Sequence, residues 1–128
     1  MDHYDIKNKG KLEMEQQAYF TTEVDNVPVA GACTIDWKLG NKQRITLPAG
    51  ATVLTFLDPE GATTLTLRVI QGPGGGTITW PGGGKIKWSN NGTIPTLTAT
   101  AAAVDLVAFY FDNYTTGKYW GTACNNFF

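Results

Sequence analysis

Residues 74–89 contain one octapeptide pattern written twice, GGGTITWP followed by GGGKIKWS. In each copy an isoleucine and a tryptophan stand two positions apart, with threonine or lysine between them. This period of two predicts a short strand in each copy, with the apolar pair on one face. The Pro-Gly-Gly-Gly segment at 81–84 favours a reversal of the chain. We therefore predict a β-hairpin with Trp80 and Trp88 on its buried face, and we interpret the glycines as turn residues rather than as a phosphate-binding loop.

Strand-like alternation recurs along the rest of the chain, separated by turn signals rich in glycine, proline and asparagine. The further predicted strands are 17–24, 33–37, 44–47, 52–57, 64–70, 97–100, 104–111 and 118–124. No segment has a convincing helical period. The pattern predicts an all-β protein, specifically an antiparallel β-sandwich of jelly-roll or tulip-like type. We expect an N-terminal arm with the first strand at 1–30 and the sandwich domain at 31–128.

The composition argues against several classes of function. The net charge is −1, and residues 1–25 hold three lysines against six acidic residues, so nucleic-acid binding is disfavoured. No apolar run approaches the roughly 18 residues that span a bilayer, and the polar N-terminus does not resemble a secretory signal. We therefore expect no membrane partner and a reducing compartment, in which Cys33 and Cys124 are two buried thiols; a disulfide between them is the alternative.

Residues that could support catalysis are few. Ser89 and His3 are the chain's single serine and histidine, and a histidine beside acidic residues near a terminus is usually solvated rather than a metal ligand. Asp105 and Asp112 are seven positions apart on one predicted strand, so they face opposite sides and cannot act as a glycosidase pair. We interpret Asp105 as an edge or interface carboxylate. We expect no enzyme activity, no metal and no cofactor.

The aromatic residues divide into a core set and an exposed set. Three of the four tryptophans share a strand face with isoleucine and are predicted to pack in the core rather than stack on sugars: Trp37, Trp80 and Trp88. Tyr119 and Trp120 are consecutive on a strand, so one of them must face away from the core. With Tyr114, they are the aromatics that we expect to be most exposed. Tyr114 and Trp120 are candidate contacts for a glycan.

Residues 104–111 form the longest apolar stretch, and they are apolar on both strand faces. A single sandwich buries only one face of a strand, so we expect the other to pack against a second subunit. The predicted subunit interface consists of Val107, Phe109, Phe111, Tyr119 and Trp120.

Several strings, in order, resemble a module found in structural proteins of tailed bacteriophages, in capsid decoration, head-fibre and tail-fibre proteins. They span about residues 32–124 and are TIDW (34–37), GNKQRITL (40–47), TITWP (77–81), KIKW (85–88), PTLT (95–98), AVDL (103–106) and YWG (119–121). The resemblance implies an all-β sandwich that assembles as a homotrimer, has no catalytic site of its own and belongs to a virion.

The chain departs from tail-fibre proteins of this type, in which the module is a terminal knob on a long shaft. Here about 30 residues precede it, without heptads, collagen triplets or β-helix repeats. We expect this segment to be an arm that grips a neighbouring subunit or a capsid shell. Its predicted contact residues are Tyr4, Ile6, Leu12, Met14, Tyr19 and Phe20.

The expected function is that of a capsid decoration (cement) protein, which binds the assembled head as a trimer and stabilises it. The alternative is a tail-associated or tail-fibre knob protein that contacts a host receptor glycan. The expected partners are further copies of the chain and the major capsid protein or another virion protein. The expected location is the virion surface, after assembly in the host bacterial cytoplasm.

Overall fold

A computed structural model describes residues 13, 15–114 and 118–127. Within these residues the regular structure consists of strands apart from one 3₁₀ turn and one four-residue helix, which confirms the all-β class. The elements are β1 (Val24–Asn26), β2 (Ala32–Asp36), a 3₁₀ turn η1 (Trp37–Leu39), β3 (Lys42–Leu47), β4 (Gly50–Leu57), β5 (Thr63–Gln71), β6 (Gly76–Thr79), β7 (Ile86–Trp88), α1 (Ser89–Gly92), β8 (Val104–Asp112) and β9 (Lys118–Phe127).

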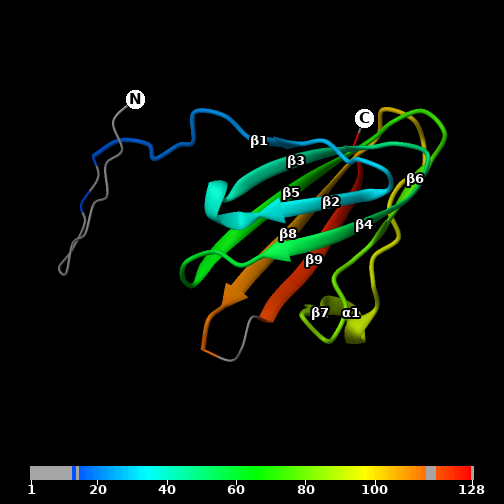
Figure 1. Cartoon of the computed structure of the whole chain (residues 1–128). Coiled ribbons are helices and arrows are strands. Elements are labelled where there is room, and N and C mark those ends of the chain that lie inside the picture. The colour runs from blue at the N-terminus through cyan, green and yellow to red at the C-terminus, as the bar shows by residue number, and fades with distance from the viewer. Residues whose placement is uncertain (1–12, 14, 115–117, 128) are drawn as a thin grey trace.

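The strands form two sheets that enclose one core (Figure 1). The larger sheet has the order β1-β3-β5-β8-β9-β7 and the smaller has the order β2-β4-β6. From β1 to β6 the chain therefore crosses from one sheet to the other at every turn. Because the chain alternates between the sheets, each strand of this part pairs with the strand two further along the chain, and these pairs are parallel: β1 with β3, β3 with β5, β2 with β4, and β4 with β6.

The predicted antiparallel pairing is confirmed for β5 with β8 and for β8 with β9, and it is wrong for the other five pairs. Turns that were interpreted as hairpins, such as the one between β3 and β4, join opposite sheets instead. Alternation identifies a strand and its buried face, but it carries no information about which strand becomes the hydrogen-bonded neighbour.

The hairpin predicted at 74–89 is also wrong. β6 pairs with β4 in the smaller sheet, whereas β7 pairs with β9 in the larger one. The two tryptophans of the repeat nevertheless meet in the core, where the rings of Trp80 and Trp88 lie 5.1 Å apart in an edge-to-face contact. The repeat therefore supplies one aromatic side chain from each sheet to the same cluster.

The core is dominated by aromatic rings. Trp37 and Trp80 are buried and Trp88 packs against them half-buried, so their prediction as core residues is confirmed. Phe109 on β8 lies at the centre, and its ring contacts five others at centroid distances between 5.5 and 6.2 Å: Trp37, Phe56, Trp80, Trp88 and Tyr119. Edge-to-face pairs of this kind add to the free energy gained by burial alone.

The segment before β1 contains less strand than predicted. Of the strand expected at 17–24, only Val24 is in β1, and residues 15–22 are exposed and lead away from the sheets (Figure 1). Glu23 fixes the base of this segment, because its carboxylate accepts three hydrogen bonds from the Arg68 guanidinium, the shortest 2.6 Å. This hydrogen-bonded pair lowers the pKa of Glu23. The strand predicted at 97–100 is absent.

The two cysteines are free thiols and differ in environment. Cys33 packs half-buried against the core, and this burial raises the pKa of its thiol. Cys124 is exposed on β9, so the prediction of two buried thiols is wrong for it.

Candidate interaction surfaces

The outer face of β8 and β9 carries an exposed aromatic pair. In the antiparallel register Tyr110 lies opposite Trp120, and about half of each side chain is exposed, 54% and 49%. Small or apolar side chains continue this face along the two strands, with Ala108 opposite Thr122 and Leu106 opposite Cys124. We call these residues the Tyr110 patch: Leu106, Ala108, Tyr110, Trp120, Thr122 and Cys124.

Four of the five residues predicted at the subunit interface lie in the core instead. Each is at most 3% exposed, so no part of them is left for a second subunit: Val107, Phe109, Phe111 and Tyr119. The prediction that one strand face is free was correct, but the wrong face was assigned to the interface. Trp120 alone of the set is on the surface, and its neighbour Tyr119 is buried, so the expected exposure of Tyr119 is wrong.

A glycine shows which face of β9 is buried. A Cβ atom at Gly121 would lie 2.9 Å from the Trp88 ring and 3.0 Å from the Phe109 ring. Positions 119 and 121 therefore share the inner face, and Trp120 between them must point outward.

Charged residues border the Tyr110 patch on the same outer face. Lys118 is opposite Asp112, and Lys87 on β7 is opposite Trp120. Arg68 on β5 is opposite Leu106 and forms an ion pair with Glu23. An apolar centre with a charged rim is the usual anatomy of a protein–protein interface.

Tyr114 follows β8 and is 92% exposed. Its backbone N–H donates to Asp112 Oδ1 at 2.8 Å, just after the end of β8. The predicted exposure of Tyr114 and Trp120 is thus confirmed, and their contact with a glycan stays a prediction. In the N-terminal segment, Tyr19 and Phe20 are 76% and 53% exposed. The other predicted arm residues lie outside the described residues: Tyr4, Ile6, Leu12 and Met14.

Asp105 is a structural carboxylate rather than an edge or interface residue, so that interpretation is wrong. β8 lies between β5 and β9, and Asp105 faces inward at 2% exposure. It accepts hydrogen bonds from the Thr98 backbone N–H (2.6 Å), the Thr98 hydroxyl (2.8 Å) and the Asn126 backbone N–H (2.8 Å). It thereby ties the 93–103 connection and the end of β9 to the centre of the larger sheet.

Replacing Asp105 with alanine is expected to lower the free energy of unfolding by about 3 kcal/mol, because two backbone N–H groups lose a charged acceptor. Urea denaturation followed by tryptophan fluorescence measures the change. Asp25→Ala is the matched control: it removes an exposed ion pair with Arg44 and is expected to cost at most about 1 kcal/mol. Equal losses in the two variants would contradict the structural role of Asp105.

A second polar cluster joins the loop before β7 to the ends of β4 and β9. The Tyr119 hydroxyl donates to Asp58 Oδ1 at 2.6 Å, and Lys85 Nζ lies 3.1 Å from the same oxygen. Lys85 also donates to the Phe56 carbonyl at 2.9 Å. Burial, and then the Asp58 carboxylate, raise the pKa of Tyr119. Each of these groups is held by its neighbours, so the arrangement fastens a loop.

The remaining candidates for chemistry give no assembled site. Ser89 is hydrogen-bonded to the Thr122 hydroxyl at 3.1 Å, and His3 lies outside the described residues. Within the part of the chain that the structure describes, no three histidine, cysteine or acidic side chains are grouped as metal ligands. The helical segments found there are too short to cross a membrane. Comparisons with family models, with curated proteins and with solved structures give no match to this chain.

Proposed function

We propose that the chain is a structural component of a bacteriophage virion, namely a capsid decoration protein that binds the assembled head as a homotrimer. The observation that carries this proposal is the Tyr110 patch, an exposed aromatic pair inside a charged rim on an otherwise well-packed domain. The phage-like strings of the sequence add to it, and we interpret the two-sheet body as a variant of the sandwich that they imply. The buried polar side chains described above hold the fold together, which favours a binding role over catalysis.

The proposed action is thermodynamic. A partner that binds only the assembled shell stabilises that state by mass action. Three arms on one trimer multiply a modest affinity through effective concentration, because the second and third contacts are intramolecular. The exposed side chains of Tyr19 and Phe20 are suited to such contacts, since aromatic residues are enriched in buried interfaces.

The double variant Tyr110→Ser/Trp120→Ser is expected to weaken self-association by at least about tenfold, because it removes the apolar centre of the proposed subunit contact. Light scattering coupled to size exclusion measures the mass at several concentrations. Val53→Ser/Leu57→Ser is the matched control, because it removes two side chains of similar exposure from the outer face of the smaller sheet. A trimer that survives the first double substitution would contradict the use of the patch between subunits.

Deleting residues 1–16 is expected to leave a folded trimer that no longer binds capsid shells. The deletion ends before β1 and leaves the Glu23–Arg68 pair in place. Co-sedimentation with purified shells lacking the protein measures binding, and circular dichroism checks the fold. Normal occupancy by the truncated protein would contradict the role of the arm.

The alternative is a tail-associated knob that contacts a host glycan, and the full exposure of Tyr114 favours it. The copy number per virion separates the two functions. A decoration protein should approach the abundance of the major capsid protein in a stained gel, whereas a tail protein should match the other tail components.

A further inference from the structure

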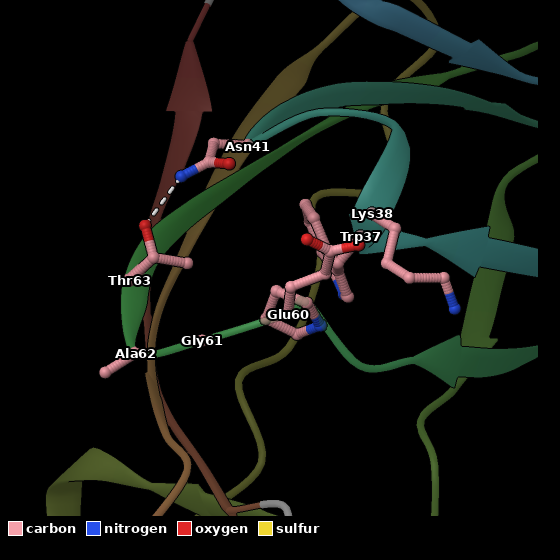
Figure 2. Close-up of a pocket in the computed structure, with 8 residues that line it drawn as sticks. Trp37, Lys38, Asn41, Glu60, Gly61, Ala62 and Thr63 are labelled. Carbon is pink, nitrogen blue, oxygen red and sulfur yellow. Dashed lines mark hydrogen bonds between the residues drawn. The ribbon is translucent and has the colours of Figure 1, made fainter. Parts of the chain in front are cut away.

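A hollow lies at the end of the body where η1 faces the loop between β4 and β5 (Figure 2). Its lining residue Thr63 pairs with Phe111 on β8, the strand that also carries Tyr110. Its volume is about 410 Å³, within the range of small-molecule sites. The residues that line it are Trp37, Lys38, Asn41, Pro59, Glu60, Gly61, Ala62 and Thr63. Nothing in the proposed decoration role uses this hollow.

Two of its walls are fixed by contacts within the fold. The Asn41 side-chain amide donates to the Thr63 hydroxyl at 2.7 Å and to the Thr64 carbonyl at 2.9 Å, which joins the two sides (Figure 2). The Trp37 ring is held edge-on against Phe56 at a centroid distance of 5.6 Å. A ligand would therefore meet a preformed surface and would lose little free energy in ordering it.

Two polar groups of the hollow have no partner among the described residues. Trp37 is 1% exposed, yet its indole N–H has no hydrogen-bond acceptor. Buried donors without an acceptor are rare in native proteins and call for a specific explanation. The second group is the exposed carboxylate of Glu60, which lines the same hollow (Figure 2).

The chemistry of the lining selects for a neutral, hydroxyl-rich ligand. Lys38 Nζ lies 3.8 Å from Asp36 Oδ1, so the positive charge of the lysine is already partly balanced. The negative charge of the Glu60 carboxylate would repel an anionic ligand. An apolar ligand would bury these polar groups without replacing their hydrogen bonds to water, which is unfavourable. A hydroxyl both donates and accepts, so a sugar ring satisfies a carboxylate, an amide oxygen and an indole N–H together.

We propose that this hollow binds one sugar ring of a glycan. Adjacent ring hydroxyls donate to the Glu60 carboxylate, and a hydroxyl oxygen accepts from the Trp37 N–H. Nε1 is closed to solvent in the free protein, so a ligand oxygen reaches it only after a lining side chain shifts, and exposed side chains such as Glu60 change rotamer quickly. Neither Tyr114 nor Trp120 is among the residues that line this hollow, and the site does not depend on whether the protein decorates a head or a tail.

The test is a titration of the ¹⁵N-labelled full chain with the methyl glycosides of glucose, galactose, mannose and N-acetylglucosamine at millimolar concentrations. The four indole N–H signals are assigned with single Trp→Phe variants. We expect at least one glycoside to shift the Trp37 indole signal in a saturable manner and to leave the Trp120 signal unchanged. Glu60→Gln, which removes no contact of the fold, should weaken that binding by roughly tenfold, because a charged acceptor becomes a neutral one.

Glu15→Gln is the matched control, an exposed acid in the N-terminal segment, and should bind as the parent does. The inference is overturned if no glycoside moves the Trp37 signal, or if the shift appears at Trp120 instead. It is equally overturned if glycine, a zwitterion of both charges, produces the same saturable shift, or if Glu60→Gln binds as tightly as the parent. Loss of self-association in the Tyr110→Ser/Trp120→Ser variant should leave the Trp37 titration unchanged, so the two proposals fail separately.

Discussion

Replacing Phe109 with alanine is expected to lower the free energy of unfolding by about 3–5 kcal/mol, the usual cost of deleting a fully buried phenylalanine. The side chain is 1% exposed, and its ring touches five other aromatic rings drawn from both sheets. The cavity left by the truncation would be bounded by rigid rings that cannot collapse into it. Urea denaturation with far-ultraviolet circular dichroism measures the loss.

The neighbouring residue provides the control. Tyr110→Ala changes an aromatic ring of similar size one position along the same strand, but on the outer face. It is expected to alter stability within about 0.5 kcal/mol and to reduce self-association instead. If Phe109→Ala were as stable as the parent and dissociated the oligomer, the assignment of the two faces of β8 would be reversed.

The positions of most strands follow from local pattern. Alternation located β2, β3, β4, β5, β8 and β9 to within a few residues, because a strand buried on one face must alternate. The same argument placed Trp37, Trp80 and Trp88 inside. It failed at 17–23 of the strand predicted at 17–24, and at 97–100, where the residues are strand-like in type but have no sheet neighbour to complete their hydrogen bonds.

The arrangement of the strands could not be inferred in this way. A short turn between two strands is compatible with a hairpin and equally with a crossing between two sheets. The glycines at 82–84 favoured the hairpin, yet they lie in a loop that runs from the smaller sheet to the larger. What decides is the set of long-range contacts, above all the antiparallel neighbours that β8 finds in β5 and β9. That information is not local.

The candidate surfaces were predictable to the same degree. Residues 104–111 are apolar on both strand faces, and this correctly indicated that one face remains uncovered in a single chain. The pattern does not reveal which of the two faces is buried in the core and which is exposed. The position of Asp105 was predicted wrongly because a carboxylate in an apolar strand is more often near solvent. Here two backbone N–H groups and a hydroxyl take the place of water as its hydrogen-bond donors. The hollow at Trp37 has no sequence signal, because an unpartnered indole N–H is a property of three-dimensional surroundings.

The second large effect is expected at Gly76, the first residue of β6. A Cβ atom there would lie 2.2 Å from the Pro48 carbonyl oxygen and 2.9 Å from the Leu47 Cβ, far inside van der Waals contact. The position is held on both sides, since the buried Gln71 amide donates to the Gly76 carbonyl (2.7 Å) and its oxygen accepts from the Gly76 N–H (2.9 Å). Gly76→Ala should therefore cost about 3 kcal/mol or more, because backbone rather than a flexible side chain must move.

Gly82→Ala is the matched control, since a Cβ there meets nothing within 4 Å and the residue has no positive φ. It is expected to change the free energy of unfolding by no more than about 0.5 kcal/mol, or to raise it slightly by restricting the unfolded chain. Chemical denaturation of both variants measures the difference. A large gap would show that Gly76 is required for the close approach of β6 to the β3–β4 turn, which lets the chain cross between sheets here. Equal stabilities would mean that this turn can shift at little cost, and the tight crossing would then not be what fixes the order of the smaller sheet.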